Sequence, residues 1–306
     1  MFRVANFAQH QLTLSYAMRT QSSLAERQIE IASGKRAQLY SSISSQSSEL
    51  VNVERSVARS DQFSRNIDQA LTRLGIMESS VGTMVDRATE VLSILSSAMS
   101  GENINDIPLQ EFASTFLAEV ESLLNTQHED RFLFAGSQTN NRAVNLSDPG
   151  YTPQAGLPGT FTADFGYYQG DDLQLSVRSA ETFETTYGVT ANEPAFEELL
   201  RGLSYMDYAG ANLDGAVLEE AYTMIKAAVD GLSDVRGRIG ASSKVLESAK
   251  SGHEDYLTYA TNLVSSLEDV DVAEATTRLA QDGVQLQASY LALSRISEMS
   301  LLQYLR

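Results

Sequence analysis

The sequence predicts a mainly α-helical protein with a small β-rich insert. Its N- and C-terminal segments are expected to form a long antiparallel coiled-coil hairpin, with the β domain at the tip. Two observations support this fold class. All five prolines lie between residues 108 and 194, and the proline-free flanks suit long helices because proline inside a helix costs about 3 kcal/mol. Both flanks also repeat apolar residues at alternating steps of three and four, which is typical of a coiled-coil seam.

The N-terminal flank carries the first predicted seam. Its members alternate steps of four and three, and one of them, Glu78, is polar. A helix with this spacing keeps one apolar face that packs against a second helix. The predicted members are Ile67, Leu71, Leu74, Glu78, Val81, Val85, Ala88, Leu92, Leu95 and Met99.

The C-terminal flank carries a second seam with the same steps, so the two flanks can pair. Pairing would bring the termini together and leave the insert at the far end. We interpret His253, a member of this seam, as a packed and hydrogen-bonded histidine. The predicted members are Ile239, Ser242, Leu246, Ala249, His253, Tyr256, Ala260, Leu263, Leu267 and Val270.

The middle of the chain has a different composition. Seven glycines occur from Gly136 to Gly188, together with aromatic and β-branched residues around Phe161 and Tyr168, a pattern that favours turns and short strands. We therefore expect three domains. These are terminal assembly helices (1–50 and 262–306), a helical rod (51–136 and 195–261) and a β-rich insert (137–194).

The terminal segments have weaker or unpartnered stripes. The N-terminal stripe is weak because glutamine occupies two of its six positions, and Ser41–Ser48 is nearly low-complexity, so we expect both to become ordered on assembly. The members of the stripe are Leu14, Ala17, Gln21, Leu24, Gln28 and Ile31. The C-terminal stripe is richer and indicates a protein partner. It comprises Leu279, Leu286, Tyr290, Leu293, Ile296, Leu301, Leu302 and Tyr304.

The overall charge argues against several classes of partner. The net charge of −18 disfavours nucleic acid, because phosphate binding needs clustered cations, and it disfavours anionic membrane surfaces. The absence of cysteine excludes disulfides, thiolate metal sites and a cysteine nucleophile. We find neither an apolar run of membrane-spanning length nor a cleavable signal peptide.

The sequence offers little for catalysis, and we expect no enzyme, cofactor or metal site. Neither His128 nor His253 has the second histidine four residues on that a helix-borne zinc site needs. We interpret Asp269-Val270-Asp271 as a helix start and Gly170-Asp171-Asp172 as a strand-end turn. Phosphate-binding loops and nucleophile elbows are also missing from the sequence.

Both ends of the chain resemble the bacterial flagellin family. The stretch LAERQIEIASGKR (Leu24–Arg36) is similar to the family segment that runs through Ser-Gly-Lys/Leu-Arg. The stretch EDVDVAEA (Glu268–Ala275), followed by residues 279–306, resembles the terminal helix of the family. After Arg36 the sequence departs from the paired aspartates that are usual in the family.

Within the family, RFLFAGSQT (Arg131–Thr139) resembles the helix-to-insert junction of the branch that joins hook to filament. The resemblance implies a ring of copies in the extracellular flagellum, between a preceding hook-associated protein and flagellin. It also implies export through the flagellar type III apparatus without signal cleavage, and a cytoplasmic chaperone before export. A filament-forming flagellin and a non-flagellar helical scaffold remain alternatives.

The resemblance and the terminal stripes together predict the assembly contacts. Apolar residues of the C-terminal helix are expected to face apolar residues of the N-terminal helix. The predicted interface residues are Phe7, Leu14, Leu24, Ile31, Leu286, Tyr290, Leu293, Ile296, Leu301 and Leu302.

Overall fold

A computed structural model of the chain describes residues 2–36, 47–100 and 107–304. Helices dominate these ranges, and the strands form two small antiparallel sheets, β1–β2 and β3–β4. The elements are α1 (Phe2–Ser33), α2 (Ser47–Ser100), α3 (Leu109–Leu124), β1 (Gln127–His128), β2 (Arg131–Phe132), β3 (Leu175–Arg178), β4 (Glu184–Tyr187), α4 (Pro194–Asn212), α5 (Gly215–Glu268) and α6 (Val272–Tyr304).

The chain divides into two compact units. The first, here called the terminal unit, comprises Met1–Arg59 and Tyr256–Arg306, and the second, the central unit, comprises Ser60–Asp255. The insert predicted at 137–194 therefore belongs to the same compact unit as the helices around it. The division falls near the expected end of the terminal helices, although the finer three-domain boundaries remain a prediction.

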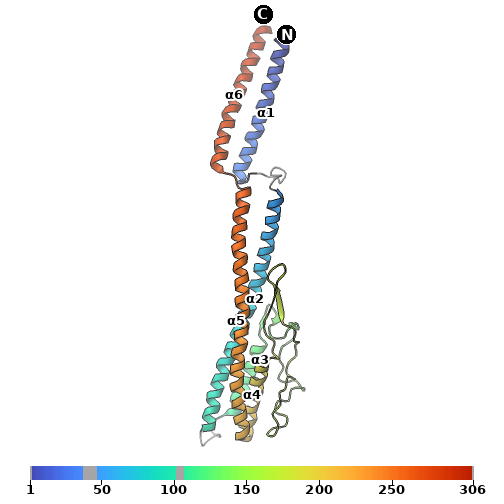
Figure 1. Ribbon diagram of the computed structural model, residues 1–306, viewed down its shortest axis with the longest axis vertical. Helices are drawn as coiled ribbons and strands as arrows, with labels where there is room; N and C mark the ends of the chain where they lie inside the picture. Colours follow the sequence, from blue (N-terminus) through green and yellow to red (C-terminus); the bar gives the residue numbers. More distant parts are fainter. Residues whose placement is uncertain (1, 37–46, 101–106, 305–306) are drawn as a thin grey trace. The chain divides into compact units, whose positions relative to one another are not determined.

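In the central unit, α2 and α5 run antiparallel, with α3 and α4 alongside (Figure 1). Glu78 on α2 pairs with Arg236 on α5, and Asp68 pairs with Lys250 further along the same two helices. The α4 helix approaches α5 closely at Gly202, where a Cβ atom would lie 2.6 Å from Ile225 Cγ1. Any larger residue at 202 would force these helices apart.

The seam predicted on α2 has the correct period but only half of the correct members. The anchors at every seventh residue, such as Ile67, Leu74 and Val81, are fully buried. Between the anchors, however, the buried apolar residues are Ala70, Met77, Met84, Val91 and Ala98. The predicted Leu71, Val85 and Leu92 are only half-buried, and Glu78 and Met99 are exposed.

Partner position explains this correction. Anchors spaced by seven residues leave two candidate stripes, one through i+3 and one through i+4, and the neighbouring helices determine which stripe is covered. Here the i+3 stripe is the buried one, and Met77 on it lies beside Gly188 of the insert. Glu78 lies on the other stripe, where it is exposed to solvent and forms an ion pair with Arg236.

The predicted seam on α5 matches the structure more closely. Ile239, Leu246 and Ala260 are buried, and the remaining members are half-buried except Tyr256, which is 37% exposed. His253 is half-buried, with Nδ1 2.7 Å from Ser60 Oγ and Nε2 2.7 Å from the Ser179 carbonyl oxygen. The interpretation of His253 as a packed and hydrogen-bonded residue is thus confirmed.

The insert lies along the side of the helices rather than beyond their tip (Figure 1). Its β3–β4 hairpin leads to the Ser179 carbonyl that contacts His253 on α5, and Arg73 Nη1 on α2 donates to Tyr187 Oη at 3.2 Å. The inner face of the hairpin buries Val177 and Tyr187. Packing against the helices removes more of these apolar side chains from water than a position beyond the helix ends would.

Most of the insert is irregular, and its core is held by turns and side-chain hydrogen bonds. Tyr167 is fully buried and donates to the Ala191 carbonyl at 2.9 Å. Glu197 on α4 is also buried, where its carboxylate accepts from Asp164 N at 2.9 Å and pairs with Arg201 at 2.8 Å. Strand content was therefore overestimated from the aromatic and β-branched residues.

The C-terminal flank contains one helix break that the sequence analysis missed. It falls at Leu213, whose φ of 55° ends α4 in the left-handed region. Asp214 Oδ1 then accepts from Ala216 N and Val217 N at 3.0 and 3.1 Å, which caps the start of α5. The sequence signal for this break is the capping residue Asp214 within the run Asn212-Leu213-Asp214-Gly215. The run contains no proline, which was the boundary signal used in the sequence analysis.

Candidate assembly surface

The terminal unit is built around the pairing of α1 with α6 (Figure 1). The half-buried and buried residues of α1 recur at steps of three and four through Ala17, Thr20, Leu24, Arg27 and Ile31. Those of α6 do the same, at Ala275, Leu279, Asp282, Leu286, Ser289 and Leu293. The two inward stripes form the seam of the α1/α6 pair.

This seam mixes apolar and polar contacts. Ser23 Oγ donates to Asp282 Oδ2 at 2.9 Å, and Arg27 Nε lies 3.8 Å from the same carboxylate oxygen. Apolar contacts are modest, since the seam positions include Thr20, Arg27 and Ser289. Because such a seam buries little apolar area, it contributes less stability than the apolar core of the central unit.

The predicted interface residues fall into three groups. Leu24, Ile31, Leu286 and Leu293 are half-buried in the seam. Leu14 and Tyr290 are 40% and 50% exposed and therefore lie outside it. The side chains of the third group lie outside the described residues, and these are Phe7, Ile296, Leu301 and Leu302.

The two sequence stretches that carry the family resemblance meet at one end of the α1/α6 pair. Gly34, with a φ of 72°, ends α1, and its carbonyl accepts from Val270 N at 3.0 Å. Lys35 Nζ lies 2.8 Å from Glu268 Oε2. Asp271 Oδ1 accepts from Ala273 N at 2.9 Å and caps α6, which confirms the predicted helix start. The serine run from residue 41 to 46 lies outside the described residues.

Apolar side chains flank the seam on both sides of α1. Leu12 and Tyr16 are each 56% exposed, and Leu14 and Met18 are 40% and 63% exposed. Successive helical residues are rotated by about 100°, so the first pair and the second pair project on opposite sides of the seam. Both flanks of the helix thus present apolar surface.

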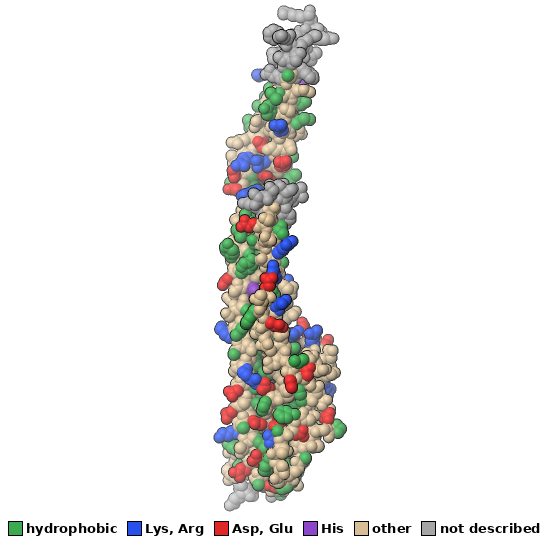
Figure 2. All heavy atoms as spheres, turned by 45° about the vertical axis from the view of Figure 1, so that its right-hand side comes forward, with side chains coloured by type: hydrophobic (Ala, Val, Ile, Leu, Met, Phe, Trp, Pro, Cys, Tyr) green, Lys and Arg blue, Asp and Glu red, His purple; other side chains and the backbone are tan. Residues whose placement is uncertain are grey.

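On α6 an apolar stripe lies on the face turned away from α1. Val284 and Leu291 are 67% and 64% exposed and are seven residues apart. They continue a line of small residues through Thr277, Ala280 and Ala288, which borders a shallow hollow of about 600 Å³. Figure 2 shows hydrophobic side chains reaching the surface along this pair.

This outer stripe was missed because its residues fall off the predicted seam. Its signal is a second set of apolar residues, Ala280, Val284 and Leu291, shifted by about half a turn from Leu279, Leu286 and Leu293. A helix with two apolar faces uses one within its own chain and leaves the other for a neighbour.

Two other kinds of feature, metal-binding clusters and membrane-spanning helices, are absent from the described part of the chain. No three His, Asp or Glu side chains in the described ranges are grouped so as to hold a metal ion. Among the described helices, none combines the length and the apolar character needed to cross a membrane.

Sequence comparison identifies the helical part that carries this surface. Residues 222–305 match the family model of the bacterial flagellin C-terminal helical region. The chain carries a flagellin C-terminal helical region. This region includes most of α5 and all of α6, and so contains both the inward and the outward stripe of α6. No curated protein matches the chain in sequence.

Solved structures share the fold around this flagellin region. Bacillus cereus FlgL has 18% identity and a TM-score of 0.56, with 70% of this chain and 98% of that chain covered. The Legionella pneumophila flagellar junction protein FlgL has 14% identity and a TM-score of 0.52, with 70% and 98% covered. Xanthomonas campestris FlgL has 13% identity and a TM-score of 0.55, with 70% and 99% covered. The chain has the fold of these flagellar proteins.

Proposed function

We propose that this protein is a structural subunit of the bacterial flagellum that forms an adaptor ring between hook and filament. The observation that carries the proposal is the outward apolar stripe of α6, within a flagellin C-terminal region and on a fold shared with FlgL. Such a stripe is costly in water and stable against neighbouring helices. The protein acts mechanically and performs no catalysis.

In this proposal the copies pack through the terminal unit. Val284 and Leu291 on the outer face of α6 contact a neighbouring helix, while Leu286 and Leu293 hold α6 to α1. One end of the ring receives a preceding hook-associated protein, and the other end receives the first flagellin subunits. The same outer stripe suits a helical chaperone before export.

Export requires the chain to pass through the flagellar apparatus unfolded and to fold at its destination without signal cleavage. The polar seam of α1 and α6 supports this order of events. Thr20, Arg27 and Ser289 contribute little apolar burial, so the pair gains most of its stability when neighbours cover its outer faces.

Electron microscopy of cells that lack the gene tests the function, with flagellin measured in the culture supernatant. We expect hooks without filaments and abundant secreted flagellin. Normal or merely shortened filaments would indicate a minor filament flagellin, an alternative with which the flagellin C-terminal match is equally consistent. Unaltered motility would contradict any flagellar role.

A further inference from the structure

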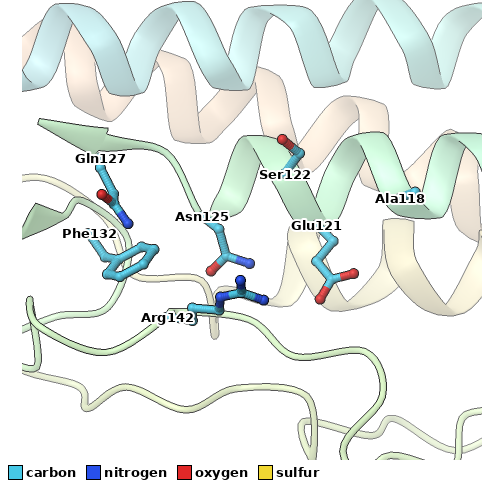
Figure 3. A pocket seen from close by; sticks show the side chains of 7 residues that line it. All are labelled: Ala118, Glu121, Ser122, Asn125, Gln127, Phe132 and Arg142. Atoms are coloured by element: carbon cyan, nitrogen blue, oxygen red, sulfur yellow. The ribbon is translucent and has the colours of Figure 1, made fainter. Parts of the chain in front are cut away.

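A polar hollow of about 340 Å³ lies in the central unit, remote in sequence from the terminal helices. It is formed by one face of α3, the β1–β2 hairpin and the loop that follows it. In Figure 3 the side chains of Glu121 and Asn125 point from α3 toward Arg142 on the facing loop. The lining residues are Ala118, Glu121, Ser122, Asn125, Gln127, Phe132 and Arg142.

The walls of this hollow are fixed by hydrogen bonds. Asn125 Nδ2 donates to the Val144 carbonyl at 2.8 Å, and Asn125 Oδ1 accepts from Val144 N at 3.0 Å. Ala143 and Val144 are fully buried, so the backbone next to Arg142 is anchored in the core. Glu121 Oε1 accepts from Leu146 N at 3.3 Å, which ties the same loop to α3. The site is therefore formed before anything binds.

The side chain of Arg142 is exposed and makes no hydrogen bond or ion pair with any residue that the structure describes. Arg87 on α2, by contrast, pairs with both Glu90 and Glu119. Glu121 lines the same hollow without forming an ion pair with Arg142. A guanidinium presents a planar fork of donors that matches a carboxylate in two hydrogen bonds. The chemical group that fits the hollow is a carboxylate.

The shape of the hollow favours a carboxylate carried on a protein. Ala118, Ser122, Gln127 and Arg142 are themselves exposed, so a free small molecule would stay largely in water, whereas small-ligand sites usually bury about 70–90% of the ligand. A side chain on a protein surface brings its own covering atoms. The surrounding protein would then exclude water from the ion pair and strengthen it.

The net charge of the chain points to a second copy as that protein. With 40 acidic and 22 basic side chains, two copies repel each other unless unpaired cations on one face meet carboxylates on the other. We infer that the Arg142 hollow receives an acidic side chain from a neighbouring copy of this chain. The inference rests on the proposed function, which puts copies side by side.

Site-specific photocrosslinking in whole cells tests this inference. A benzophenone amino acid replaces Ser122 in the full chain, and a control chain carries it at Thr89, an exposed position on α2 outside the hollow. We expect a crosslinked dimer of the chain from position 122. The peptide of the second copy that is joined to position 122 should contain an acidic residue. Arg142→Glu should lower its yield at least about tenfold, because the ion pair becomes a repulsion. Arg142→Lys should retain part of it.

Two further variants separate the ion pair from general charge effects. Arg178→Glu alters another exposed arginine whose side chain has no partner among the described residues, and it should leave the dimer yield unchanged. Glu121→Gln should raise the yield, since it removes a like charge from the side of the incoming carboxylate. Unchanged thermal unfolding of each variant establishes that it folds.

Three results would overturn the inference. They are a crosslink from position 122 to a different protein, no intermolecular crosslink from that position, or a dimer yield that is insensitive to Arg142→Glu. Isolation of flagella from the same cells tests the proposed function separately. A chain that is missing from the flagella but still forms the Arg142-dependent dimer crosslink from position 122 would contradict the proposed function. The same result would support the inference that the Arg142 hollow binds a second copy.

Discussion

Single residues fix the geometry of the insert. Asp171 accepts hydrogen bonds from Ser137 N at 2.8 Å and from Leu173 N at 3.2 Å, and so joins the two arms of the insert. Hydrogen bonds from Ser137 lower the pKa of this carboxyl. Gly136, with a φ of 67°, allows the approach, because a Cβ there would overlap the oxygen atoms of Asp171.

Substitution of Gly136 tests this close approach. Gly136→Ala should lower the free energy of unfolding by about 2 kcal/mol or more, since it adds a clash to a left-handed backbone conformation. Gly75→Ala is the matched control. Gly75 lies in α2, where an added Cβ would meet nothing within 4 Å, so alanine should raise stability by about 0.5–1 kcal/mol. Urea unfolding measures both, and equal effects would contradict the argument.

Tyr167 gives the central unit a dependence on alkaline pH. Its burial raises the pKa of the phenol well above the ordinary value of 10.0, so the folded state resists ionisation more than the unfolded state does. Stability is then retained below about pH 10 and falls as the pH rises above it. Tyr167→Phe should weaken this decrease and, through the lost hydrogen bond to Ala191, cost about 1 kcal/mol at neutral pH.

Denaturant unfolding at several pH values between neutral and strongly alkaline measures this effect. The control is Tyr259→Phe, because Tyr259 is 65% exposed on α5. It should leave the unfolding free energy at neutral pH within about 0.5 kcal/mol of the original. A Tyr167→Phe variant with the original alkaline decrease would assign the pH dependence to other groups.

At the scale of the element, the α2 helix shows how far a heptad pattern can be interpreted. The anchors Ile67, Leu74 and Val81 were predicted and are buried, because each is apolar and lies at the same helical angle. Between them the sequence offers two apolar choices, Leu71 or Ala70, and then Val85 or Met84. The larger Leu71 was the natural choice from hydrophobicity, but Ala70 is the residue that is buried, on the same stripe as Met77 and Met84.

Alanine substitutions on α2 test which stripe is the seam. Met77 is fully buried and Met99 is 44% exposed. Met77→Ala should cost about 2–5 kcal/mol, as expected for a cavity in a packed core, and Met99→Ala should cost less than about 0.5 kcal/mol. Thermal or urea unfolding of the full chain provides both values. A larger loss of unfolding free energy for Met99→Ala than for Met77→Ala would indicate that the predicted seam is the buried one.

The two faces of α6 give a second test at this scale. Val284→Asp places a charge on the outer stripe, where the side chain is 67% exposed, so the isolated chain should keep its stability within about 0.5 kcal/mol. Assembly should fail, because the charge would have to be buried against a neighbour. Filament counts by electron microscopy measure the effect. Thr89→Asp adds the same charge to an exposed position on α2 in the central unit and should leave the filaments intact.

For the whole molecule, the two compact units predict a separation between folding and assembly. Removal of residues 291–306 should abolish filament attachment, because it deletes part of both faces of α6. The central unit, Ser60–Asp255, keeps all of its own contacts and should stay folded. Limited proteolysis with mass spectrometry would detect the protected central unit, and electron microscopy would detect the missing filaments. Normal filaments from this truncated chain would refute the assembly model.

The sequence by itself determined the helical class with a small β-containing part, the heptad period and the α6 cap at Asp271. These features follow from local rules, because proline, capping side chains and the spacing of apolar residues act within a few residues of themselves. The family resemblance at both ends was also visible from short segments such as Leu24–Arg36.

Tertiary structure decided which stripe of each helix is covered, where the insert rests and that Arg142 borders a polar hollow. Leu71 and Ala70 are equally compatible with the period, and only the position of the neighbouring helices selects Ala70. The insert lies beside α2 and α5 because Tyr187 and Ser179 find partners there. Arg142 lines the same hollow as Glu121, whose Oε1 accepts from Leu146 N. Each of these outcomes depends on residues distant in sequence, whose proximity no local pattern encodes.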